Sequence, residues 1–174
     1  MSEINYPPVF TLNTDYGQPY IVAKFSVGNT PFAIVFNEIL TQTVMHSKQY
    51  HIHLPPFCFP LNGMIEIFFD MLDKQGFINF GAFQHLTPSG VNPVTFLKVA
   101  GLIRLHYTAR KPGGYLFYAA RSSVNRVSDL KAVYDRLLGF GAKRNRQFAR
   151  RYIPAGWQVY NGICRDGRGY VIIC

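Results

Sequence analysis

The sequence predicts a mixed α/β fold, α+β in arrangement, with one central mixed sheet flanked by helices and a β-hairpin at its C-terminal end. A length of 174 residues with 48% hydrophobic residues suits a single domain over residues 1–174 with a core of its own. Short apolar runs alternate with stretches of helical periodicity, as in folds that interleave strands and helices. An Asp-Gly turn between two apolar runs, Trp157–Ile163 and Gly169–Ile173, indicates the closing hairpin.

The N-terminal part is predicted to contain a strand, a helix and a second strand. After an irregular lead-in over residues 1–18, Tyr20–Val27 is typical of a strand. Thr30-Pro31 then resembles a helix start, because a hydroxyl can cap the first turn and proline fits the first helical position. The apolar residues that follow share one helical face, which predicts a helix to about His46. Gln49–Leu54 is predicted as the next strand.

The middle of the chain is predicted to form a hairpin and then a helix. Met64–Leu72 fits both the alternation of a strand and the periodicity of a helix. A hairpin with Phe77–Phe83 is favoured, because a four-residue loop ending in glycine joins the two runs. Asn92-Pro93 repeats the signal of a cap followed by proline, so a helix is expected there, and Pro112-Gly113-Gly114 ends it.

Residues 113–140 hold the clearest local pattern. Tyr115–Ala120 is a compact apolar run that predicts a buried strand, and a polar turn containing Asn125 follows it. Ser128 can cap the next helix, whose apolar residues recur at helical spacing. Gly139 suits the left-handed position at a helix C-terminus.

This strand, asparagine-containing turn and helix ending in Gly-Phe resemble the C-terminal half of the GNAT superfamily of N-acetyltransferases. The helix end Val133–Phe140 is similar to the family pattern Leu-Tyr-Glu-x-Leu-Gly-Phe, with one extra residue before Gly-Phe. The resemblance covers residues 20–174 and is closest over residues 77–174. An ordinary strand-helix unit of another α/β fold is the alternative.

The resemblance implies a cofactor, acetyl-CoA or another acyl-CoA, between two parallel strands that part, here Phe77–Gln84 and Tyr115–Arg121. The coenzyme would lie near the backbone of Phe83 and the side chain of Asn125. Its pyrophosphate would meet backbone amides of the loop Thr87–Asn92, since a helix N-terminus offers unpaired donors and a favourable dipole.

That loop departs from the family pattern, which usually reads Gln/Arg-x-x-Gly-x-Gly/Ala. It contains one glycine, Gly90, and prolines at positions 88 and 93. Ser89, Gly90 and Val91 could still bind phosphate, and a loop that only connects a strand to a helix is the alternative.

Three residues are candidates for catalysis. Tyr134 matches the family tyrosine that protonates the departing thiolate, and a phenol with a pKa of about 10 can donate a proton. Packing in the core is its alternative role. His85 and Glu66 are the candidate general bases, or else structural residues. The pair His51-x-His53 lacks the paired spacing of known zinc sites, so no metal site is predicted.

Positive charge is concentrated in the C-terminal part of the chain. Residues 1–100 hold four Lys and no Arg against six acids, a net charge of −2, whereas residues 101–174 hold fourteen Lys and Arg against three acids, a net charge of +11. Five cations stand close together, interleaved with aromatic residues: Lys143, Arg144, Arg146, Arg150 and Arg151. Such a segment can bind nucleic acid or an acidic protein, and a merely solvated basic face is the alternative.

Two functions follow. The first is an acyl-CoA-dependent N-acyltransferase acting on an amine of an acidic or nucleic-acid-associated acceptor. The second is a non-catalytic nucleic-acid-binding protein. No apolar run is long enough to cross a bilayer, no export signal begins the sequence, and three widely spaced cysteines fit free thiols, so a cytoplasmic protein without membrane contact is expected.

Overall fold

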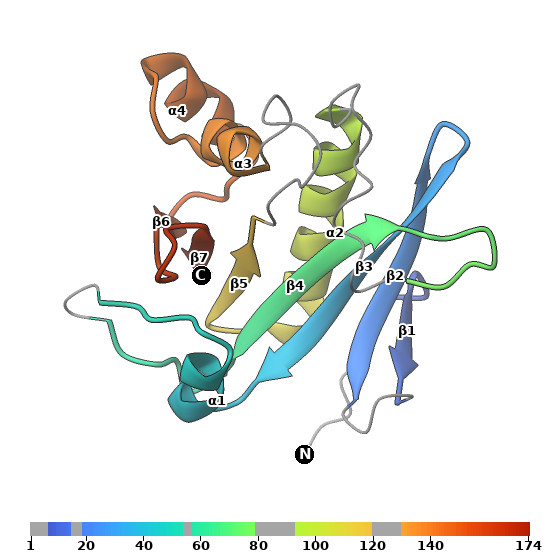
Figure 1. Ribbon diagram of the computed structural model, residues 1–174, viewed down its shortest axis with the longest axis horizontal. Coiled ribbons are helices and arrows are strands. Elements are labelled where there is room, and N and C mark those ends of the chain that lie inside the picture. Colours follow the sequence, from blue (N-terminus) through green and yellow to red (C-terminus); the bar gives the residue numbers. More distant parts are fainter. Residues whose placement is uncertain (1–6, 15–18, 54–56, 79–92, 120–129) are drawn as a thin grey trace.

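A single mixed sheet organises the computed structural model, which describes residues 7–14, 19–53, 57–78, 93–119 and 130–174. Within these ranges the sheet has seven strands, in the order β1-β2-β3-β4-β5-β7-β6, and four helices accompany it (Figure 1). The strands are β1 (Phe10–Asn13), β2 (Tyr20–Val27), β3 (Thr30–Ile39), β4 (Met64–Met71), β5 (Gly114–Tyr118), β6 (Gln158–Asn161) and β7 (Gly169–Ile173). The helices are α1 (Gln42–Ser47), α2 (Pro93–Arg110), α3 (Leu130–Leu138) and α4 (Lys143–Ala149).

The sheet combines two antiparallel parts through one parallel pair. Strands β1 to β4 pair antiparallel with their neighbours in sequence, and β7 lies antiparallel between β5 and β6. The parallel pair is β4 with β5. The predicted mixed sheet is confirmed, and so is the C-terminal hairpin, in which Gly167 of the Asp-Gly turn adopts a φ of +72°.

The prediction of a helix after Thr30 is wrong, because this segment forms strand β3. Gly28, at a φ of +58°, and Asn29 form a tight turn, and β3 returns along the whole of β2 with Val27 opposite Thr30. The run Phe32–Phe36 is buried throughout, since β3 lies between two strands with apolar layers on both faces. A helix forms only later, at α1, where Thr41 Oγ1 accepts a hydrogen bond of 3.2 Å from the Val44 N–H.

Other N-terminal boundaries also differ from the expectation. The lead-in contains β1, which pairs with β2 from Phe10 to Asn13. Gln49–Leu54 is not a strand over its described residues, and it contributes only a bridge between Tyr50 and Cys164. The expected hairpin partner of β4 is seen only as a bridge from Leu72 to Ile78, and residues 79–83 lie outside the described ranges. The strand Tyr20–Val27 and the helix beginning at Pro93 are confirmed.

Two helices cover one face of the sheet, which we call the helix face. Its core includes Phe36 from β3, Ile67 from β4, Val99 from α2, Tyr134 from α3 and Ile172 from β7. The opposite face carries a smaller core in which α1 and the segment after it pack on the sheet through Met45, Tyr50 and Ile52. Figure 1 shows α2 running along the middle of the sheet, with α3 and α4 together at its β5–β6 end.

Polar contacts hold α3 against the C-terminal hairpin. The Asp135 carboxylate accepts hydrogen bonds from Tyr170 Oη at 2.8 Å, Asn161 Nδ2 at 3.2 Å and Lys131 Nζ at 2.7 Å. Partial burial raises the pKa of Asp135, but these donors outweigh it and leave the pKa below its usual value. Gly139 follows α3 at a φ of +90°, which confirms the predicted helix end.

Candidate functional site

The parallel strands β4 and β5 separate soon after they begin. Their ladder has two register pairs, Ile65 with Tyr115 and Glu66 with Leu116, although both strands continue beyond them. Figure 1 shows the two ribbons diverging from this point. The gap therefore exists, but the prediction that Phe77–Gln84 forms one side of it is wrong. Strand β4 takes that place because it pairs with β3 along its whole length and with β5 at its start.

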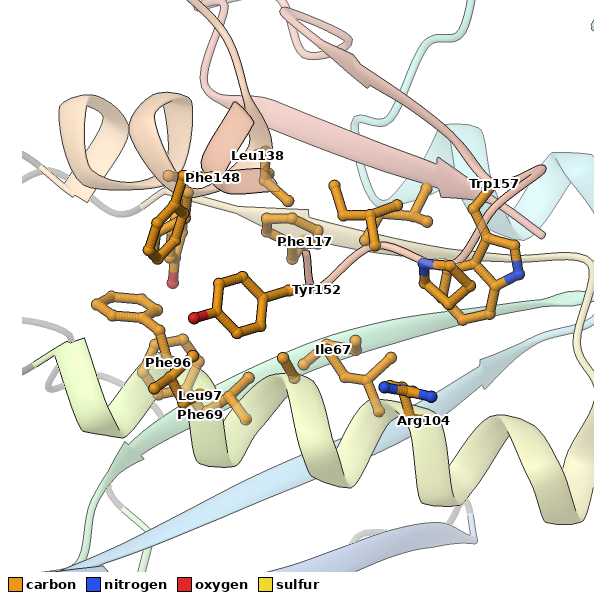
Figure 2. Close-up of a pocket in the computed structure, with 18 of the residues that line it drawn as sticks. Ile67, Phe69, Phe96, Leu97, Arg104, Phe117, Leu138, Phe148, Tyr152 and Trp157 are labelled. Atoms are coloured by element: carbon orange, nitrogen blue, oxygen red, sulfur yellow. The ribbon is translucent and has the colours of Figure 1, made fainter. Parts of the chain in front are cut away.

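A cavity of about 120 Å³ lies beside this gap on the helix face (Figure 2). Strand β5 contributes both Phe117 and Tyr118 to its wall, and consecutive strand residues point to opposite faces, so the cavity reaches the gap itself. The other lining residues come from β4, β7, three helices and the α4–β6 connection: Ile67, Phe69, Phe96, Leu97, Val99, Ala100, Ile103, Arg104, Tyr134, Leu137, Leu138, Phe148, Tyr152, Ile153, Pro154, Trp157 and Ile172.

Tyr134, the candidate acid, both packs in the core and lines this cavity. Its ring makes edge contacts with Phe96 at 5.7 Å and Phe117 at 5.4 Å between centroids. Its hydroxyl has no hydrogen bond among the described residues. Burial, and then the negative charge of Asp70, raise the pKa of Tyr134 well above its usual value, so the phenol is protonated at neutral pH.

Glu66, the candidate base, lies on the opposite face of the sheet from Tyr134. Its side chain is buried, and Oε2 is 2.5 Å from Lys48 Nζ and 3.4 Å from Asn37 Nδ2. Burial raises the pKa of the neighbouring Tyr50, and the charge of Glu66 raises it further. The structure therefore does not bring the two candidate catalytic residues together on one face. Glu66 lies at the last pair of the β4–β5 ladder, whereas Tyr134 packs on Phe69 and Phe117, beyond that pair.

The remaining candidates for catalysis and coenzyme binding lie outside the described residues. These are His85, Phe83, Ser89, Gly90, Val91 and Asn125. The helix that follows the expected phosphate loop, α2, begins at Pro93 as expected.

The five predicted cations gather on α4 and the turn that follows it. We call Lys143, Arg144, Arg146, Arg150 and Arg151 the basic surface; all five are exposed. None of them forms an ion pair with a carboxylate in the part of the chain that the structure describes. Phe148 and Tyr152 pack together beneath them, with ring centroids 4.9 Å apart, and both also line the cavity.

Sequence reasoning missed Arg104 and Lys48. Arg104 is a charged residue that the apolar spacing of its helix does not mark, yet it lines the cavity. Lys48 pairs with Glu66 only because the chain turns back after α1, and no local sequence pattern predicts this pairing.

The histidines near α1 form a stack. His46 lies 5.2 Å from His51, and His51 lies 6.2 Å from His53, between ring centroids. Over the described ranges, no cluster of three or more His, Cys, Asp or Glu side chains is arranged to hold a metal ion.

The sequence matches no protein-family model, no curated protein and no solved structure. Among the described helices, none combines the length and the apolar character needed to span a bilayer.

Proposed function

We propose that this protein is an acyl-CoA-dependent N-acyltransferase with a GNAT-like fold, acting on an amine of an acidic or nucleic-acid-associated acceptor. The observation that carries the proposal is the early separation of β4 from β5, after Glu66 and Leu116, beside an apolar cavity. The order of the strands and the helix after each of these two strands agree with the resemblance in the sequence.

The residues around the gap suit an acyl-CoA. Beyond Glu66 and Leu116 the facing edges of β4 and β5 are not paired with each other, so backbone groups there can hydrogen-bond the amides of an extended ligand. The cavity wall of aromatic and aliphatic side chains suits the apolar parts of such a ligand. A bound acyl-CoA would supply an activated thioester carbonyl.

Tyr134 and Glu66 would handle protons on the two sides of the gap. The phenol of Tyr134 is protonated and has no hydrogen bond among the described residues, so Oη is available to donate a proton to a leaving sulfur. The carboxylate of Glu66 would accept a proton from an amine that approaches from the α1 face, in place of its ion pair with Lys48. His85 remains the alternative base.

Calorimetric titration with acetyl-CoA tests the proposal. We expect saturable heat, and Tyr134→Phe should retain the heat, because the hydroxyl would act only in transfer. Tyr152→Phe is the matched control, a second tyrosine of the cavity wall that has no assigned part in proton transfer. Absence of heat at high protein concentration would contradict the proposal.

A second candidate function is nucleic-acid binding by the basic surface, without transfer activity. It is favoured by five exposed cations that have no carboxylate partner among the described residues, beside the packed pair Phe148 and Tyr152. Cations of this kind bind phosphates with a strong salt dependence, and neighbouring aromatic rings can stack on bases. Binding that is absent, or insensitive to salt, would contradict this function.

A further inference from the structure

Among the described residues, one charged side chain lies in the wall of the cavity on the helix face. That residue is Arg104, and every other described lining residue is apolar or aromatic, with tyrosine hydroxyls as the main polar groups. Arg104 is exposed, and within the described ranges it forms no ion pair and no carboxylate lines the wall. An apolar chamber with one available guanidinium is complementary to a ligand that has an apolar body and one anionic group.

The shape and volume of the cavity limit the apolar body. Figure 2 shows Phe96 and Phe148 at one end and Trp157 and Arg104 at the other, with Ile67 between them. Its volume of about 120 Å³ corresponds to roughly eight water-sized groups, at about 15 Å³ for each. An elongated space of this capacity fits an unbranched chain better than a ring system.

We infer that this cavity binds an unbranched aliphatic monocarboxylate of about eight carbons, with its chain toward Phe96 and its carboxylate on Arg104. Burying each methylene group of the chain strengthens binding about fourfold. The guanidinium of Arg104, which is exposed to solvent, binds the carboxylate through charge-assisted hydrogen bonds. This site uses the cavity wall that the proposed function assigns to the apolar parts of an acyl-CoA, but it goes beyond the transfer reaction because it needs neither coenzyme nor acceptor.

Trp157 makes the inference directly measurable. It is the single tryptophan of the chain, it lines the cavity, and its ring packs 4.8 Å from that of Tyr107. We expect octanoate to change the Trp157 fluorescence saturably and to shield it from acrylamide, whereas acetate does neither. Hexanoate should bind roughly 15-fold more weakly than octanoate, and uncharged octanamide about 10-fold more weakly. No response to octanoate in the unsubstituted protein would overturn the inference, and this measurement needs no variant.

Substitutions locate the site. Ala100→Phe should fill the cavity and abolish the octanoate response, and the adjacent exposed Gly101→Ala is its control, since nothing lies within 4 Å of the added Cβ. Arg104→Gln should weaken octanoate about 10-fold and leave octanamide unchanged, whereas Arg144→Gln on the basic surface should change neither. Unchanged octanoate binding in a folded Ala100→Phe protein, or equal affinity for octanoate and octanamide, would overturn the assignment.

The octanoate experiment and the acetyl-CoA titration test the two proposals separately. Octanoate binding without any heat from acetyl-CoA supports this site and contradicts the proposed acyltransferase. Heat from acetyl-CoA with no octanoate response contradicts this site and leaves the acyltransferase standing.

Discussion

Glu66 lies opposite Leu116 at the last register pair of the parallel β4–β5 ladder, and beyond this pair the two strands diverge. The carboxylate of Glu66 is buried on one face of the sheet, where Lys48 Nζ lies 2.5 Å from it. Tyr134 lines the cavity on the other face. The two candidate catalytic residues therefore lie on opposite faces of the sheet, with Tyr134 packed on Phe69 and Phe117, beyond the end of the ladder.

The ion pair between Lys48 and Glu66 predicts a coupled effect on stability. Lys48→Met should lower the free energy of unfolding by about 1–3 kcal/mol, because it leaves a buried carboxylate without its cation. Adding Glu66→Gln to Lys48→Met should recover most of that loss, since no buried charge then remains. Chemical denaturation of the single and double variants measures the coupling. Additive effects of the two substitutions would show that the pair is not formed.

The hydroxyl of Tyr134 should matter for transfer and little for folding. Because it has no hydrogen bond among the described residues, Tyr134→Phe should change the free energy of unfolding by less than about 1 kcal/mol. If Tyr134 is the acid, the same change should lower the transfer rate by about 100-fold or more. Tyr170→Phe is the matched comparison for folding, because Tyr170 Oη bonds Asp135 at 2.8 Å and the Lys131 carbonyl at 3.1 Å. We expect it to cost about 1–3 kcal/mol, and an equal cost for both variants would contradict this difference.

His106 should make the fold less stable in mild acid. Its imidazole is completely buried, stacks on Phe36 at 4.2 Å, and has Nδ1 3.1 Å from Tyr115 Oη. Burial, and then the charge of Arg110, lower the pKa of His106 to about 4. In the unfolded chain, His106 binds a proton near pH 6.5. The contribution of neutral, buried His106 to the free energy of unfolding is therefore full above that pH and is lost as the pH falls from 6.5 toward 4.

Between pH 6.5 and pH 4 the protonation of His106 alone should lower the free energy of unfolding by up to about 1.4 kcal/mol for each pH unit. Urea denaturation at several pH values measures it. His106→Phe, which keeps the ring on Phe36, should flatten that part of the profile, and an unchanged profile would show that His106 is not buried in its neutral form.

Two glycines should respond oppositely to alanine. A Cβ on Gly114, at the start of β5, would lie 2.5 Å from the Ile172 carbonyl oxygen and 2.8 Å from Met64 Cε. Gly114→Ala should therefore destabilise the protein by about 1–3 kcal/mol, since β5 and β7 must move apart. Gly101→Ala, in α2 with open space around it, should stabilise it by up to about 1 kcal/mol. Thermal unfolding compares the two variants. An unchanged unfolding temperature in Gly114→Ala would contradict the close packing of β5 against β7.

The basic surface predicts how nucleic-acid binding depends on salt. Arg150→Gln with Arg151→Gln should weaken binding to single-stranded DNA and reduce the slope of log K against log salt by about 1–2. Arg110→Gln removes a cation that Glu38 already engages at 2.9 Å, so it should change the slope less. Fluorescence anisotropy at several salt concentrations measures both. An equal change for each charge removed would indicate that net charge alone, and not this surface, governs the interaction.

Local signals sufficed for part of the fold. Strand β5, helix α3 and the β6–β7 hairpin followed from a glycine break, a helical apolar spacing and an Asp-Gly turn, each of which acts over a few residues. Strand β3 was mistaken for a helix because its continuous apolar run has no period of two. A strand buried on both faces loses that alternation, and only its neighbours β2 and β4 decide its structure.

Of the candidate site, the sequence predicted only residues that a local sequence pattern marks. Tyr134 was found from its position in the helix pattern, and the structure places it in the cavity wall. Arg104 lines the cavity only because α3 and the α4–β6 connection pack opposite α2, and Lys48 meets Glu66 only after the chain has turned through α1. Their roles arise from tertiary packing, which no local pattern encodes.

Hydrogen exchange with and without acetyl-CoA tests the central claim, that the gap between β4 and β5 holds an acyl-CoA. The account predicts slower exchange at the amides of Ile67, Phe69 and Tyr118, which face the gap because the N–H of Leu72 bonds β3 and that of Ala119 bonds Arg168 beside β7. It predicts no change in β1 and β2, which lie at the far edge of the sheet. Unchanged exchange on both sides of the gap at a saturating concentration of acetyl-CoA would contradict it.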